Sequence, residues 1–345
     1  MYNIQRIYKK IISKEGDILK NKVKQTIEKY NLINEEDKIL VAVSGGPDSI
    51  SLLNVLHDLG YNLCVAHVNH GLRENAKKDE EFVKNFCEER NIPCFIKKIN
   101  LKELMESDIA LKGMSTEEAG RKARYDFFNE VLRKQNCNKI ATAHNSNDNV
   151  ETVIMNMVRG SGLSGLKGID ASRDNIIRPL IETSRKEIEE YCKENNLNPR
   201  HDESNDETVY TRNKVRLELI PYIEKNINSN VVNNITRMSK IISEEERFIL
   251  DLVEQSYNEI VLKESETEII CSLKLFNNLD VVLKRRLILK MIIKVLGNAK
   301  DIEKVHVDDI VKLCQNNVGG KFLTPNKNIK ISVLRGKVKF EKAFN

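Results

Sequence analysis

KILVAVSGGPDSISLLNVL, residues 38–56, is the most informative part of this chain. It begins with an apolar run typical of a buried strand, and residues 49–59 have the apolar spacing of a helix. Between the two lies the turn Ser44-Gly45-Gly46-Pro47-Asp48-Ser49. A strand, a glycine-rich turn and a helix in this order predict the first unit of an α/β fold.

The turn has the composition of an anion-binding loop. Gly45 and Gly46 allow backbone N–H groups to close around an anion, and the helix that follows adds the positive end of its dipole. The hydroxyls of Ser44 and Ser49 can donate further hydrogen bonds. The loop lacks the Gly-Lys-Ser/Thr ending of a Walker A loop. Asp48 would repel a phosphate unless a cation lay between them, and Mg²⁺ takes oxygen ligands from both groups. The alternative is an ordinary Gly-Pro turn in which Asp48 caps the helix.

The strand–helix alternation continues beyond this unit. We expect further strands at residues 63–68, 94–99, 139–143 and 176–181, and helices at 77–90, 116–135, 148–158 and 185–195. This pattern predicts an α/β fold with a doubly wound parallel sheet, whose ligands bind at the carboxyl ends of the strands. The unusual polar segments follow strand ends, namely Ser44–Ser49, Asn69–Gly71 and His144–Asp148.

The pattern changes after about residue 210. Apolar residues recur at helical spacing over 213–262 and 279–296, and a short helix is expected at 306–316. Two β-like segments follow, at 329–334 and 337–340. We therefore predict a catalytic domain over 1–215, with a helical lead-in over 1–36, and a mainly helical domain over 216–345 that ends in a small β element.

Composition limits the classes of function. The chain has 345 residues, 56 basic and 51 acidic, for a net charge of +5. It has no apolar stretch of about 18 residues and no secretory leader, so we expect no membrane partner. Seven scattered cysteines without a CxxC pair indicate reduced thiols in the cytoplasm and no metal–sulfur site. Clusters of basic residues suit a polyanion such as RNA, although each alone could be a solvated surface. A homodimer is compatible with the sequence.

The turn Ser44–Ser49 resembles the SGGxDS signature of the PP-loop family of ATP pyrophosphatases. The resemblance implies that the chain binds ATP, breaks its α–β bond, holds pyrophosphate in the loop and transfers AMP to an oxygen of a substrate. Members of that family adenylate very different substrates. The turn therefore indicates the half-reaction and not the substrate.

Further motifs are similar to those of the tRNA(Ile)-lysidine synthetase family. They are AHVNHGLR at 66–73, EAGRKARY at 118–125, AHNSNDNVET at 143–152, RGSGLSGL at 159–166, RPL at 178–180, DESN at 202–205 and RNKVR at 212–216. The likeness runs from about residue 38 to 222. The family's Asp-Asp-Gln appears here as Asn147-Asp148-Asn149, so no role of the first carboxylate can be carried over. Bacterial members of the family often carry a further domain beyond the helical one.

The resemblance, together with the chemistry of the side chains, implies the roles of the candidate residues. Catalytic residues are expected to be Asp48, Arg121, Asp148 and Glu151, with Asp48 and Asp148 as Mg²⁺ ligands. ATP is expected to contact Ser44, Gly45, Gly46, Pro47, Asp48, Ser49, Ala66, His67, His70, Arg124 and His144. The residues expected to contact tRNA are Arg159, Arg178, Arg185, Arg212, Arg216, Lys284, Arg285 and Arg286.

The spacing of these residues agrees with such roles. Asp148 and Glu151 lie three residues apart, on one helix face and in its first turn. Arg121 and Arg124 are also three apart and can stabilise charge that develops on the phosphates. Each feature has a structural alternative: Asp148 as a helix cap, the two arginines as a salt-bridged helix face, and His144 as a loop histidine.

The resemblance further implies the reaction. The wobble cytidine in the CAU anticodon of tRNA(Ile) would be adenylated at its C2 oxygen, and free L-lysine would then displace AMP to give lysidine. Asp148 or Glu151 could position the lysine ammonium and take its proton. The alternatives are a tRNA 2-thiolation enzyme of the PP-loop family, which requires a sulfur carrier, and a non-catalytic RNA-binding protein.

Overall fold

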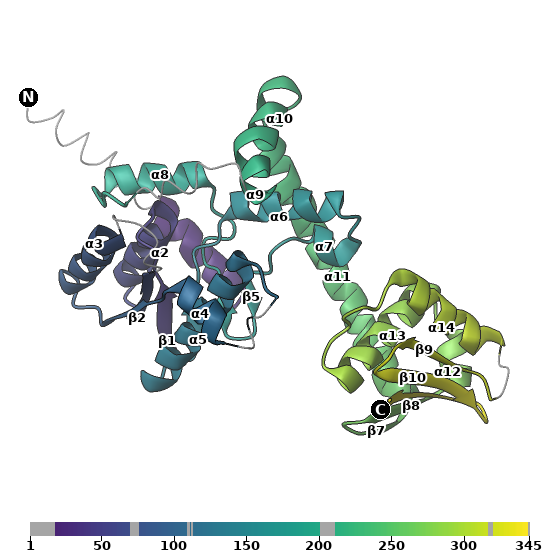
Figure 1. The fold of residues 1–345 in the computed structure, drawn as a ribbon. Coiled ribbons are helices and arrows are strands. Elements are labelled where there is room, and N and C mark those ends of the chain that lie inside the picture. The colour runs from purple at the N-terminus through teal and green to yellow at the C-terminus, as the bar shows by residue number, and fades with distance from the viewer. Residues whose placement is uncertain are drawn as a thin grey trace, which may run out of the picture. The chain divides into compact units, whose positions relative to one another are not determined.

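The computed structural model describes residues 18–69, 76–108, 111, 113–200, 211–316 and 320–343 (Figure 1). His70, the rest of its motif to Arg73, the DESN motif at 202–205 and the lead-in up to residue 17 lie outside the described residues. The chain forms two compact units, Met1–Ile242 and Ser243–Asn345. The functional division at residues 215 and 216 stays a prediction.

The first unit is built on a six-stranded sheet. Its strands are β1 (Lys38–Ala42), β2 (Asn62–Asn69), β3 (Cys94–Lys98), β4 (Lys139–Ala141), β5 (Ser172–Arg173) and β6 (Ile176–Ile177). Their order is β3-β2-β1-β4-β6-β5, and all neighbours pair in parallel except β5 with β6. The predicted parallel sheet is confirmed. The strand expected at 176–181 ends at Ile177, because the chain turns at Arg178 and Pro179 has no N–H to donate.

Helices cover both faces of this sheet. They are α2 (Pro47–Asp58), α3 (Ala76–Glu88), α4 (Leu101–Ser107), α5 (Thr116–Lys134), α6 (Ser146–Val158), α7 (Leu163–Leu166) and α8 (Arg185–Glu194). Ile39 and Val41 of β1 point into a core with α2, α3 and α8, whereas Leu40 points into a second core with α5. This alternation is expected of a strand buried on both faces.

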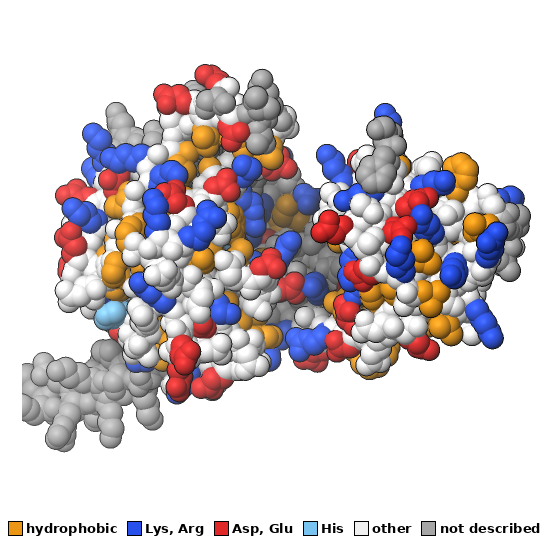
Figure 2. Space-filling view, turned by 90° about the horizontal axis from the view of Figure 1, so that it is seen from below, with side chains coloured by type: hydrophobic (Ala, Val, Ile, Leu, Met, Phe, Trp, Pro, Cys, Tyr) orange, Lys and Arg blue, Asp and Glu red, His pale blue; other side chains and the backbone are white. Residues whose placement is uncertain are grey.

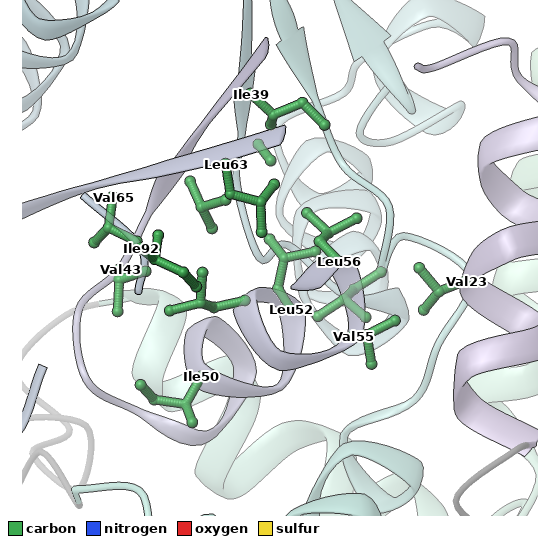
Figure 3. Close-up of a cluster of buried hydrophobic side chains, with 14 of the residues drawn as sticks. Val23, Ile39, Val43, Ile50, Leu52, Val55, Leu56, Leu63, Val65 and Ile92 are labelled. Atoms are coloured by element: carbon green, nitrogen blue, oxygen red, sulfur yellow. The ribbon is translucent and has the colours of Figure 1, made fainter. Parts of the chain in front are cut away.

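The larger core fixes the strand and helix on either side of the glycine-rich turn. Figure 3 shows Ile39, Leu63 and Val65 of the sheet gathered with Leu52 and Leu56 of α2. These side chains are fully buried or nearly so. Each such side chain contributes about 1.5–3 kcal/mol of hydrophobic stabilisation. The turn is therefore held between two rigid elements.

A group of helices follows the sheet. It comprises α9 (Thr211–Lys214), a π-helical turn (Val215–Leu219), α10 (Ile220–Asn226) and the long α11 (Val231–Ile260). Val215 and Ile220 pack with Val150 and Ile154 of α6 in a small core of their own. This packing brings the side chains of Arg212 and Arg216 next to the first turn of α6.

The second unit contains the end of α11, three further helices and a five-stranded antiparallel sheet. Its elements are β7 (Val261–Glu264), β8 (Glu268–Ser272), α12 (Leu273–Asn278), α13 (Val281–Leu296), α14 (Lys304–Asn316), β9 (Phe322–Asn326), β10 (Ile329–Leu334) and β11 (Lys337–Lys342). The strand order is β7-β8-β11-β10-β9, around a core that includes Phe276 and Phe340. The predicted helices and terminal β element are confirmed. The sheet is larger than expected because β7, β8 and β9 join the two predicted strands.

Candidate active site

The glycine-rich turn closes on itself around one hydroxyl. Ser49 Oγ accepts hydrogen bonds from the backbone N–H groups of Ser44 and Gly45, both at 3.2 Å, and donates to Gly46 O at 3.1 Å. Gly45 has φ +97°, a left-handed conformation that favours glycine. Gly46 is the N-cap of α2 and makes no side-chain capping bond. The amides of the turn therefore converge on an oxygen atom, and the dipole of α2 points into the turn.

Asp48 lies in the first turn of α2 and reaches across to α6. Its Oδ1 accepts a hydrogen bond from Asn145 Nδ2 at 3.1 Å. Burial and, next, the negative charge of Asp148 raise the pKa of Asp48 to about 6, although Arg185 and Arg216 oppose the shift. A carboxylate in this position is stabilised by an added cation. Asp48 thus fits the predicted role of an Mg²⁺ ligand.

The first turn of α6 is fixed by a reciprocal cap. Asn145 Oδ1 accepts from the N–H of Asp148, and Asp148 Oδ2 accepts from the N–H of Asn145, both at 3.0 Å. Asp148 is therefore a capping residue, as the structural alternative expected, and also the neighbour of Asp48. Asn145 was not selected from the sequence. Its signal was the Asn-x-x-Asp spacing of a capping box in front of an apolar run.

Three arginines hold the carboxylates of Asp148 and Glu151. Arg216 donates to Glu151 from Nε at 2.6 Å and from Nη2 at 2.9 Å, and to Asp148 Oδ1 at 3.0 Å. Arg212 donates to Glu151 at 2.7 Å and to Asp148 at 3.3 Å. Arg185 lies 3.8–3.9 Å from both. Three positive charges thus face two negative charges, and the Glu151 side chain is only 1% exposed.

This cluster bears on two expectations from the sequence. Arg185, Arg212 and Arg216 were expected to contact tRNA, and the structure places them on the carboxylates. Asp148 was expected to bind Mg²⁺, but both of its oxygens already accept hydrogen bonds. The geometry therefore supports Asp48 as a cation ligand more strongly than Asp148. Among the described residues there is no group of three metal-ligating side chains.

His144 lies in the segment between β4 and α6, with its Nδ1 3.0 Å from Thr142 Oγ1. Burial lowers the pKa of His144 to about 4; the charge of Asp148 opposes this shift, and Arg178, Arg212 and Arg121 reinforce it. The imidazole is therefore neutral at pH 7. It can donate one hydrogen bond to a phosphate but cannot neutralise its charge.

The other expected arginines differ in exposure. Arg121 and Arg124 are exposed on α5, where the Arg121 guanidinium lies 5.1 Å from the centre of the Tyr125 ring. Arg178 is buried and donates from Nη1 to Asp170 O at 2.6 Å. Arg159 is exposed at the end of α6. Of these residues, Arg121 and Arg178 act electrostatically on His144, so they lie near the site.

His67 and Ala66 lie inside the sheet. Ala66 is fully buried and His67 is 3% exposed, with His67 Nδ1 2.9 Å from Val43 O. In this conformation the His67 side chain contacts the carbonyl of the residue that follows β1, so the backbone of the segment is the part that a nucleotide would contact. A neighbour that the sequence did not indicate is Arg200, whose N–H donates to Gly45 O at 2.9 Å and supports the turn from outside.

The basic cluster of the second unit is largely engaged within that unit. Lys284 is buried, Arg285 pairs with Asp308 at 2.7 Å, and Arg286 forms two hydrogen bonds with Glu246 at 2.5 and 2.6 Å. Figure 2 shows basic and acidic side chains interspersed on the face in view. Within the described part of the chain, no helix is long and apolar enough to cross a membrane.

Comparison of the sequence with known proteins identifies a protein family and close relatives. Residues 17–223 match the family model of the PP-loop domain. Over 89% of the chain, the sequence is 44% identical to a tRNA(Ile)-lysidine synthase of Clostridium tetani, and over 90% it is 42% identical to one of Clostridioides difficile. The matches cover 66% and 67% of those proteins, so the chain spans about two thirds of their length.

A solved structure shares the fold at low identity. It is the U34-tRNA thiolase NcsA of Methanococcus maripaludis, with a TM-score of 0.51 and 20% identity. The likeness covers 65% of this chain and 78% of the thiolase. At this identity it supports the fold alone.

Proposed function

The chain belongs to the PP-loop family and, within it, to the tRNA(Ile)-lysidine synthases, and from this premise we propose that it ligates lysine to a tRNA cytidine. The C2 oxygen of the wobble cytidine in the CAU anticodon attacks the α-phosphate of ATP, which gives an adenylated cytidine and pyrophosphate. The ε-amine of free L-lysine then forms a bond to C2 and expels AMP. The reaction takes place in the cytoplasm.

One observation carries this proposal: the hydrogen bond from Asn145 to Asp48 brings the glycine-rich turn and the carboxylates of α6 into a single site. The turn follows β1 and α6 follows β4, and these two strands are neighbours in the sheet. Both segments therefore lie at the carboxyl edge, where ligands of parallel sheets bind. A phosphate-binding loop next to paired carboxylates suits a reaction that joins a nucleotide and an amine.

The turn supports the ATP half-reaction. Its amides and the N-terminus of α2 are suited to the pyrophosphate. His144 and Arg121, which acts on it electrostatically, would contact the α-phosphate, and Arg124 follows from the resemblance. Ala66, His67 and His70 follow from the resemblance as neighbours of the adenosine. Asp48 would hold Mg²⁺, which would offset the charge of the phosphates.

The carboxylate–arginine cluster supports the lysine half-reaction. A lysine amine is neutral in only roughly one molecule in two thousand at pH 7. Asp148 and Glu151 can bind the lysine ammonium and accept the proton that its nitrogen must lose before the bond to C2 forms. An ammonium that enters must take over hydrogen bonds now made by Arg212 or Arg216. The guanidinium that is released can then bind the carboxylate of the amino acid or a phosphate of the tRNA.

The basic residues support the binding of tRNA(Ile). Arg159 is exposed and can meet a phosphate directly, whereas Arg285 and Arg286 would have to leave their carboxylate partners first. An anticodon loop exposes its bases, so the target cytidine can leave the stack at low cost.

Product analysis tests the proposal against its alternatives. The chain is incubated with tRNA(Ile) transcript and ATP, with either lysine or a sulfide donor, and the nucleosides are analysed by mass. We expect cytidine to gain the mass of lysine with loss of water, and only when lysine is present. A gain of sulfur would indicate a thiolase; the described cysteines are free, and most of them are buried. An unchanged nucleoside with intact tRNA binding would indicate a non-catalytic RNA-binding protein.

A further inference from the structure

A buried amide directly follows the first carboxylate of α6. The side chain of Asn149 is almost fully buried, and both of its ends make hydrogen bonds. Its Oδ1 accepts from the N–H of Ile169 at 2.6 Å, and its Nδ2 donates to Ser239 Oγ at 3.1 Å. Because a backbone N–H can only donate, the oxygen of the amide must face Ile169, and its orientation is fixed.

The hydroxyl of Ser239 completes this network. Ser239 lies on α11, is 2% exposed, and donates to Lys167 O at 2.6 Å. Its only proton is therefore used on the carbonyl, and its oxygen accepts from Asn149. The network thus joins α6, the segment 167–169 and α11, and its members are all satisfied.

Gly168 shows how closely these parts approach one another. It has φ +73°, and a Cβ at this position would lie 2.0 Å from Asn149 Oδ1 and 3.0 Å from Val153 Cγ2. No side chain fits there. The segment 167–169 is therefore packed directly against the buried amide, which agrees with the short hydrogen bond from Ile169.

Lys240, the next residue of α11, supports the other side of the first turn of α6. Lys240 Nζ lies 3.0 Å from Glu182 Oε1, and Glu182 begins the segment that leads into α8. In that segment, Thr183 O accepts from the N–H of Ser146 at 2.9 Å, and the N–H of Arg185 donates to Asn147 Oδ1 at 2.9 Å. Two consecutive residues of α11 thus hold the two segments that enclose the start of α6.

We propose that Asn149 and Ser239 are positioning residues, which fix α6 against α11 so that Asp148 and Glu151 present their carboxylates to the lysine amine. This inference rests on the proposed function and deepens it. Neither residue touches the reacting atoms. Asp48 is carried by α2 and the glycine-rich turn, so the network acts more strongly on the lysine step than on the binding of ATP.

The variant Ser239→Ala tests this inference, with Ser243→Ala as a matched control. Ser243 lies one turn further along α11 and, among the described residues, makes no side-chain hydrogen bond. A displacement of reacting groups by about 1 Å can lower a rate about 100-fold. For Ser239→Ala we expect the KM for lysine to rise about ten-fold or more, the KM for ATP to change less than about two-fold, and Ser243→Ala to match the parent.

Hydrogen exchange gives a second measurement that does not require activity. In Ser239→Ala, the amides of residues 146–151 and of Ile169 should exchange faster than in the parent chain, while the amides of α2 keep their protection. Unchanged exchange in both segments, or equal rises of KM for lysine and ATP, would overturn the proposal. If the parent chain fails to modify tRNA, the proposed function falls, and the exchange measurement still decides whether the network holds α6.

Discussion

Arg216 forms a bidentate hydrogen bond with Glu151, from Nε to Oε1 at 2.6 Å and from Nη2 to Oε2 at 2.9 Å. The two residues are 65 positions apart in the sequence. The planar guanidinium matches the carboxylate, so the geometry of the pair is fixed as well as its charge. Because Glu151 is buried, the loss of either partner leaves an uncompensated charge in a site of low polarity.

The first prediction concerns this pair. Glu151→Ala leaves three arginines facing one carboxylate and should lower the free energy of unfolding by about 3 kcal/mol. It should also abolish lysine transfer. The control is Glu190→Ala on α8, whose side chain is 55% exposed and pairs with Lys186 only at 4.0 Å. It should change the free energy of unfolding by less than about 1 kcal/mol. Urea unfolding gives the change in the free energy of unfolding for each variant. Equal changes in the two variants would contradict a stabilising role of the buried pair.

The second prediction is that Asp48 is required for AMP formation and not for the binding of tRNA. Asp48→Asn keeps the shape of the side chain and the acceptor for Asn145 but removes the negative charge. We expect AMP formation to fall by about 100-fold or more, while tRNA affinity stays within about two-fold. Asp126→Asn on α5, 63% exposed, is the control and should leave both unchanged. Normal AMP formation by Asp48→Asn would exclude the role of Asp48 as a cation ligand.

The third prediction concerns salt. Each phosphate contact of a basic side chain releases counterions, so tRNA affinity should fall steeply with salt concentration while ATP affinity changes little. Arg159→Ala should reduce the slope of log affinity against log salt by about 1. Filter binding at several salt concentrations gives the slopes. Equal slopes for tRNA and ATP would argue against the basic tRNA surface.

The fourth prediction concerns pH. Burial raises the pKa of Glu182, but hydrogen bonds from Lys29, Tyr30 and Lys240 outweigh this effect and bring the pKa down to about 2 from an ordinary 4.5. Because the folded pKa is the lower one, the stabilisation is complete above pH 4.5 and disappears as the pH falls toward 2.

Glu182→Gln should therefore be about 1–2 kcal/mol less stable than the parent at pH 7, and the difference should shrink between pH 4.5 and 2. Urea midpoints at several pH values test this expectation. A difference that stays constant down to pH 2 would show that the carboxylate charge contributes nothing.

The sheet and the position of the site follow from local sequence. The strands β1 to β4 are short apolar runs bounded by turns, and this pattern predicted the sheet. Because the glycine-rich turn comes directly after the first of these runs, the position of the site was predicted as well. Helix α6 was also expected from the strand–helix alternation, and with it the position of Asp148 and Glu151 on one helix face. These features depend on neighbours within a few residues, which is why the sequence reveals them.

The contacts within the site depend on distant parts of the chain. The sequence offered no sign that Arg216 would meet Glu151, because the π-helical turn and the packing of Val215 on α6 set that contact. Nothing in the sequence singled out Ser239. His67 was expected beside the nucleotide, and its ring contacts the carbonyl of Val43, between β1 and the glycine-rich turn. Such pairings emerge only when the elements pack.

The most direct measurement uses ATP labelled at the α-phosphate, together with tRNA(Ile) transcript and lysine. The account predicts that the label appears in AMP, with one pyrophosphate released per AMP, and that turnover requires both tRNA and lysine. Label in ADP, with release of orthophosphate, would contradict it.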